Sequence, residues 1–248
     1  MMAMGVSLIA FAVIFAGVFI GALLHRALPG HHLEDAKDVV RLGTGLIGTI
    51  AALVLGLLIG SAKGSYDTQN TQMKTVTADI ILLDQVLAQY GPETHELRDL
   101  VRRAVGSLID RIWTEKPADT GVAFASSAAA DVAYTKLLEL APQTESQRAW
   151  KSRAVQLSID LAQARLALFV RATGPIPVPF LAVLVFWLTI IFASFTLFSR
   201  LNPTLIVALF ICALSASGAI YLILELGQPF SGLMQISSAP LRNALAPL

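Results

Sequence analysis

The glycine-rich segment 43–48 resembles a cofactor-binding motif. Its order Gly-Thr-Gly-Leu-Ile-Gly fits the GxGxxG pattern that holds a dinucleotide phosphate. That pattern works only after a buried strand, with an acidic residue about twenty positions further on for the ribose. Here a charged run, residues 34–41, precedes the glycines, and a long uncharged run follows them. The motif therefore does not predict a nucleotide site.

Other groups that could do chemistry are not spaced for it. The carboxylates and arginines of residues 63–174 alternate as they do on solvated helix faces. Three neighbouring histidines, His25, His31 and His32, could bind a transition metal, but no second cluster supports this, and histidines at a membrane surface are the better interpretation. The single cysteine, Cys212, excludes an intrachain disulfide and a cysteine-based metal site. The sequence predicts no enzyme, metal or cofactor.

The composition places the chain among membrane proteins. Of its 248 residues, 55% are hydrophobic and only 14% are charged, whereas soluble domains carry about a quarter charged residues. The net charge of +1 gives no indication of a nucleic-acid partner. The lipid bilayer is the first partner that the sequence predicts.

The apolar runs predict four transmembrane helices, at residues 6–25, 43–62, 178–199 and 203–225. Each is close to the twenty or so residues that cross a hydrocarbon core about 30 Å thick. The first run could instead be a cleaved signal peptide, but no Lys or Arg precedes it and its apolar run is long for one. Four crossings would put both termini on one side of the membrane.

Between the second and third runs, the chain becomes polar and holds most of its charged side chains. Apolar residues recur there at helical spacing, and the breaks at 91–92, 116–117 and 142 separate four helices without a strand. We therefore expect an all-α protein in three parts: two spans in 1–62, a helical extramembrane domain in 63–174 inserted between spans two and three, and two spans with a tail in 175–248.

The second span has two distinct faces. Small residues recur at every fourth position, a spacing that lets another helix approach closely, so we expect this face to pack against neighbouring helices: Gly48, Ala52, Gly56, Gly60 and Gly64. A second stripe falls on the other side of the helix and faces either lipid or a pore: Ile47, Ile50, Val54, Leu57 and Ser61.

One carboxylate lies at the end of a span. Glu225 closes the fourth apolar run, and a charge at that depth either reaches water or is paired within the protein. Three alternatives remain open: an exposed carboxylate at the membrane surface, a polar site near a conduction path, or an anchor for the tail through Arg242.

Two phrases, at residues 39–48 and 225–232, together with the four spans and the inserted helical domain, resemble the bestrophin-like domain family of bacterial membrane proteins. The resemblance implies a pentamer in the bacterial inner membrane, with an anion pore lined by the second span and the helical domain in the cytoplasm. One departure is clear. No carboxylate follows Glu225, so the acidic calcium clasp of animal bestrophins has no counterpart here.

Two functions from different classes follow. The leading hypothesis is a homo-oligomeric ion channel for small inorganic anions. The alternative is a membrane-anchored helical scaffold or sensor without transport activity. A secondary transporter ranks third, because four spans without a detectable inverted repeat are few for that class.

Overall fold

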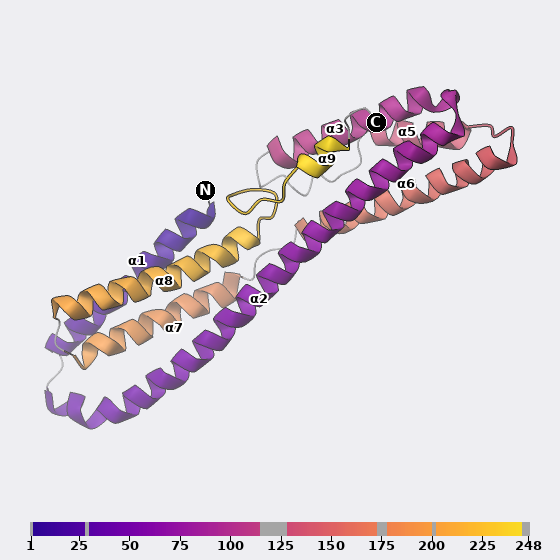
Figure 1. Cartoon of the computed structure of the whole chain (residues 1–248). Helices are drawn as coiled ribbons and strands as arrows, with labels where there is room; N and C mark the ends of the chain where they lie inside the picture. The colour runs from indigo at the N-terminus through magenta and orange to yellow at the C-terminus, as the bar shows by residue number, and fades with distance from the viewer. Residues whose placement is uncertain (1, 28–29, 115–127, 173–177, 200–201, 245–248) are drawn as a thin grey trace. The chain divides into compact units, whose positions relative to one another are not determined.

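The computed structural model describes residues 2–27, 30–114, 128–172, 178–199 and 202–244. Within these ranges the chain is helical and contains no strand, as the composition and periodicity predict (Figure 1). The chain divides into two compact units. The membrane unit comprises Met1–Ser65 and Pro175–Gly227, and the helical unit comprises Tyr66–Gly174 and Gln228–Leu248.

Among the described residues, four helices are long and apolar enough to cross a membrane. They are α1 (Met2–Ala27), α2 (Gly30–Tyr90), α7 (Val178–Leu197) and α8 (Pro203–Leu226). The four predicted spans fall on these four helices.

The helix α2 is longer than the sequence suggested. It runs for 61 residues without interruption, so the second span and the first helix of the polar region form one element. No proline lies between Gly30 and Tyr90, and isolated glycines weaken a helix by only about 1 kcal/mol each. The change in composition after Ala62 therefore marks a change of surroundings and not a break in the helix.

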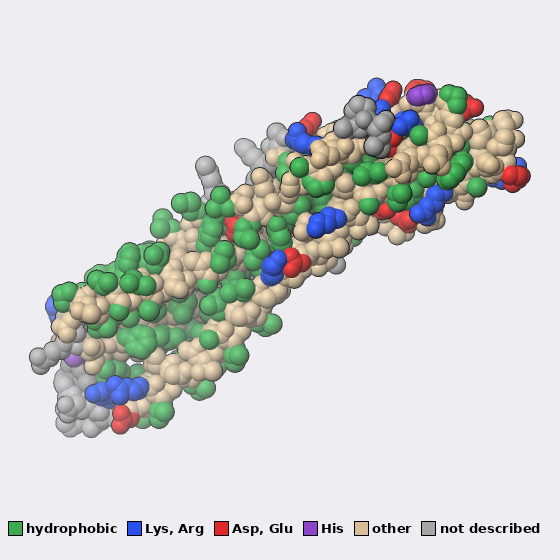
Figure 2. Space-filling view, in the orientation of Figure 1, with side chains coloured by type: hydrophobic (Ala, Val, Ile, Leu, Met, Phe, Trp, Pro, Cys, Tyr) green, Lys and Arg blue, Asp and Glu red, His purple; other side chains and the backbone are tan. Residues whose placement is uncertain are grey.

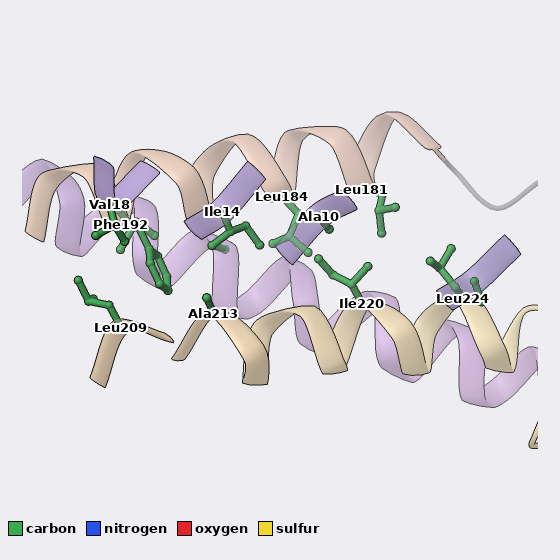
Figure 3. Close-up of a cluster of buried hydrophobic side chains, with 13 residues drawn as sticks. Ala10, Ile14, Val18, Leu181, Leu184, Phe192, Leu209, Ala213, Ile220 and Leu224 are labelled. Carbon is green, nitrogen blue, oxygen red and sulfur yellow. The ribbon is translucent and has the colours of Figure 1, made fainter. Parts of the chain in front are cut away.

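The core of the membrane unit lies among α1, α7 and α8. Figure 3 shows side chains from these three helices pointing toward one another, with Ile14, Leu184 and Ile220 fully buried. Two buried hydroxyls join the helices: Ser217 Oγ donates to the carbonyl oxygen of Ser7 at 2.7 Å, and Thr196 Oγ1 donates to that of Val18 at 2.9 Å. Such bonds between helices replace the water that lipid cannot supply.

The helical unit is built from the C-terminal part of α2 with η1 (Pro92–Thr94), α3 (His95–Thr114), α5 (Ala128–Glu139), α6 (Glu145–Ala172) and α9 (Ala239–Asn243). Figure 2 shows most of the visible charged side chains on these helices, whereas hydrophobic side chains cover the helices of the membrane unit. This contrast fits one unit made for water and one made for lipid. The third helix expected between the breaks at 116–117 and 142 is described from Ala128 onward as α5, and residues 115–127 lie outside the described residues.

The C-terminal tail belongs to the helical unit, although the sequence grouped it with the third and fourth spans. Phe230, Ile236 and Leu241 are buried in a cluster with residues of α2 and α3. The indole nitrogen of Trp113 donates to the carbonyl oxygen of Ile236 at 2.9 Å. The tail is too polar to span, but its few large apolar residues suffice to hold it against the helical bundle.

One ion pair within the helical unit is shielded from water. The guanidinium of Arg98 donates two hydrogen bonds, of 2.9 and 2.6 Å, to the carboxylate of Asp84, and the two side chains are 16% and 13% exposed. The hydrogen bond from Arg98 is the main cause that lowers the pKa of Asp84, with a smaller contribution from the charge of Arg102. Because the pKa of Asp84 is lowered in the folded protein, the ionised pair of Asp84 and Arg98 stabilises the folded helical unit.

Replacing Asp84 by Asn should therefore cost the helical unit about 1–3 kcal/mol of unfolding free energy at pH 7. Because the folded pKa is depressed, this stability is present above the unfolded pKa of about 3.9 and is lost as the pH falls through the folded value. Thermal unfolding of the purified protein at pH 7 and at pH 3 measures it. Asp99→Asn is the control, because Asp99 is 67% exposed and its pair with Arg102 is long, at 3.7 Å; an equal loss in both variants would contradict this account.

Candidate functional site

The membrane-spanning part of α2 is the least buried of the four candidate spans. Only 6% of its most apolar stretch is buried, compared with 33% for α1 and 28% each for α7 and α8. Its contacts with the core come from Ala51, which is buried, and from the half-buried Ile47, Leu55 and Leu58. These residues recur every three or four positions and so occupy one side of the helix.

The opposite side of α2 carries a row of strongly exposed apolar side chains. They are 65% to 76% exposed, and we call them the exposed ridge: Val39, Leu42, Leu46, Leu53 and Leu57. At about 100° per residue, these positions fall within about 60° of one another and roughly opposite Ala51. The sequence predicted only Leu57 among them, although the recurrence of leucine along this face could have revealed the ridge.

The predicted apolar stripe is divided between two environments. Ile47 and Val54 are half-buried, and Ile47 packs on the core. Ile50 is 39% exposed, Leu57 is 73% exposed, and Ser61 is exposed. The stripe therefore runs along one edge of the exposed side and is not turned fully away from the subunit.

The predicted glycine face does not pack against another helix among the residues that the structure describes. A Cβ added at Gly48 would meet only the tip of Ile191, at 3.9 Å, and a Cβ added at Gly56, Gly60 or Gly64 would meet nothing within 4 Å. Ala52 is exposed as well. The reason is geometric: α2 meets the core through the side that carries Ala51, so this face is left open.

In the described part of the chain, two glycines of α1 lie against the backbone of another helix. A Cβ on Gly17 would lie 2.6 Å from the carbonyl oxygen of Thr189, and one on Gly21 would lie 2.0 Å from that of Ala193. Gly17 and Gly21 are four residues apart, which is the small-xxx-small spacing. The same sequence pattern that indicated α2 was therefore present in α1, where it was missed.

Glu225 is buried, with an exposed fraction of 5%. Tyr221 lies one turn earlier on α8, where the charge of Glu225 acts on its hydroxyl. The structure thus contradicts the expectation of an exposed carboxylate at the membrane surface. Arg242, the suggested tail anchor, is exposed, and its Nε donates to Ser238 Oγ at 3.2 Å. A role of Glu225 near a conduction path stays a prediction.

Comparison with known proteins gives one family match and several structural matches. The bestrophin-like domain matches residues 10–241 of the chain. Three solved structures of a bacterial bestrophin homologue from Klebsiella pneumoniae share the fold. One variant structure has a TM-score of 0.68 at 14% identity, and the match covers 98% of this chain and 95% of that chain. A second variant has a TM-score of 0.64 at 15% identity, and the match covers 96% of each chain. A third has a TM-score of 0.67 at 13% identity and covers 96% of this chain and 95% of its own.

No curated protein matches the sequence. The family match covers nearly the whole chain, and the structural matches extend over both units. Together with its long apolar helices, these findings identify an integral membrane protein. The chain belongs to the bestrophin-like domain family.

Proposed function

We propose that the protein is a homo-oligomeric channel of the bacterial inner membrane that conducts small inorganic anions, with α2 surrounding the conduction path. The observation that carries this proposal is the exposed ridge of α2. Its apolar side chains are strongly exposed in the described part of the chain, whereas the spans of α1, α7 and α8 pack around a common core. The family of the chain favours a ring of subunits as the way in which this side of α2 is covered.

In a closed ring, each copy presents the same surface around the axis. The side of α2 that carries Ala51 faces its own subunit, so the opposite side with the exposed ridge turns toward the axis. Ala52 and Gly56 lie beside the ridge at about 100° per residue and give a neighbouring helix room for close approach, whereas Gly60 and Gly64 lie on the face of the ridge itself. Five copies are the number that the resemblance to bestrophins implies.

The narrow part of the path is an apolar neck. Leu53 and Leu57 of the ridge and Ile50 of the predicted stripe supply its side chains, while Ile47 and Val54 lie closer to the subunit core. A ring of such side chains gates by expelling water from the constriction. Selectivity comes from the width of the neck and from polar groups at its mouth, where Ser61 and Lys63 lie at exposed positions of α2.

In this proposal the four candidate spans each cross the bilayer once, so both termini and the helical domain lie on one side of the membrane. The resemblance to bestrophins implies that this side is the cytoplasm. Bestrophin-type channels move ions without chemical conversion, so the protein has no enzymatic role. The long helix α2 continues from the conduction path into the helical domain.

Two measurements on the purified protein test the proposal. Native mass spectrometry should show one homo-oligomer, and liposomes that contain the protein should release trapped chloride faster than empty liposomes. A stable oligomer without ion flux would favour the alternative, a membrane-anchored scaffold or sensor. A monomer without flux would contradict both the ring and the pore.

A further inference from the structure

A pocket of about 490 Å³, partly open to solvent, lies between α2, α3, α5 and α6 of the helical unit; we call it the cavity. Its walls are mostly apolar and include Val76, Leu83, Leu97 and Leu137. Volumes of about 300–1,000 Å³ are typical of sites that bind small molecules.

Three charged side chains line one part of this cavity, each from a different helix: Arg111 from α3, Asp131 from α5 and Arg165 from α6. Arg165 is half-buried, and burial is the main cause that lowers the pKa of its guanidinium. The charge of Asp131 raises that pKa and the charge of Arg111 lowers it, and all three side chains line the same pocket. Their sum is one positive charge at the wall of an apolar cavity.

Asp131 is the carboxylate whose charge acts on Arg165, so it balances one of the two guanidinium charges. Arg111 Nε donates to the carbonyl oxygen of Ser107 at 3.3 Å, which leaves the rest of its guanidinium fork for other acceptors. Two guanidinium groups near each other favour an anion between them.

The charges gather toward one end of the cavity. Val76, Val105 and Leu108 belong to the hydrophobic cluster around Ile109 and Leu168, which lie within one helical turn of Arg111 and Arg165. Leu87, Leu97 and Leu137, at the other end, belong to a second hydrophobic cluster. The lining of α2 runs from Val76 to Leu87, about 16 Å at 1.5 Å per residue.

We propose that this cavity binds a single-chain amphipathic carboxylate, such as a free fatty acid, with its carboxylate between Arg111 and Arg165 and its chain along the apolar walls toward Leu87. A guanidinium matches a carboxylate with two parallel hydrogen bonds, and the partial burial of Arg165 strengthens the attraction. The apolar chain gains from leaving water. The cavity lies wholly within the helical unit, so the proposal does not depend on whether the protein conducts ions.

The test uses the full-length protein in nanodiscs, with radiolabelled laurate as the probe and empty nanodiscs as the blank. We expect saturable binding of one laurate per subunit. The double variant Arg111→Gln with Arg165→Gln should bind about tenfold to a hundredfold more weakly, because it loses charge-assisted hydrogen bonds. Arg103→Gln is the matched control and should bind like the parent, since Arg103 is exposed on α3 and does not line the cavity.

Two further measurements separate this site from nonspecific uptake. Ala104 lines the cavity, so Ala104→Leu should reduce binding by filling it, while circular dichroism verifies that the variant is folded. On the parent protein, unlabelled laurate should compete with the probe and dodecyltrimethylammonium, its cationic counterpart, should not. Binding equal to that of empty nanodiscs, equal competition by both amphiphiles, or equal affinity of the double variant and Arg103→Gln would each overturn the proposal.

Discussion

Replacing Gly21 by Ala is expected to separate α1 from α7 and to destabilise the membrane unit by about 2–4 kcal/mol. The added methyl group would lie 2.0 Å from the carbonyl oxygen of Ala193 and 2.2 Å from the hydroxyl of Thr196. The first contact is with backbone, so a rotamer change cannot relieve it. Moving α7 away also weakens the 2.9 Å hydrogen bond from Thr196 to Val18. Thermal unfolding in detergent, followed by size-exclusion chromatography, measures the loss.

Gly5→Ala is the matched control on the same helix, because a Cβ at Gly5 would meet nothing within 4 Å. Alanine favours a helix over glycine by about 1 kcal/mol in water, so this variant should be as stable as the parent or slightly more stable. If Gly21→Ala unfolds at the same temperature as Gly5→Ala, the close approach of α1 and α7 is wrong.

A double variant of α2, Leu53→Ala with Leu57→Ala, is expected to raise the basal conductance of the reconstituted protein. These residues are 70% and 73% exposed on the exposed ridge, so their truncation removes volume from the proposed neck without opening the core of the subunit. A wider and less apolar constriction holds water more readily and opens the path to ions. Single-channel recording in a synthetic bilayer measures the change in current.

The control for this prediction is Phe186→Ala on α7, which truncates a side chain that is 61% exposed on another candidate span. It should leave the current unchanged. An unaltered current in the double variant, when it assembles as the parent does, would show that the ridge faces lipid or a neighbouring subunit.

Much of the fold could be predicted from the sequence, because a bilayer demands long uncharged runs and prolines end helices at fixed positions. The periods of apolar residues in 63–174 likewise indicated helices. The continuity of α2 could not be predicted, since the composition changes at Ala62 while the helix does not end there. The position of the C-terminal tail could not be predicted either, because it depends on contacts of Phe230 and Leu241 with residues that are far away in the sequence.

The candidate site was predicted less well, because periodicity shows which residues share a face but not what that face meets. The small-residue pattern occurs in both α1 and α2, yet only Gly17 and Gly21 lie against a neighbouring backbone. The exposure of Leu53 and the burial of Glu225 follow from how the helices pack together. The cavity beside Arg165 is likewise formed by four helices that are separate in the sequence.

Blocking the current through a cysteine on α2 tests most directly whether this helix lines an ion path. The variant carries Leu57→Cys with Cys212→Ser, because the natural Cys212 is exposed and would also react. We predict that a charged, water-soluble thiol reagent changes the single-channel current of this variant and does not change the current of the single variant Cys212→Ser. We also predict that the current of the parent protein reverses at the potential set by the chloride gradient. A variant that assembles normally but shows no current, or a current that the reagent does not change, would contradict a pore lined by Leu57.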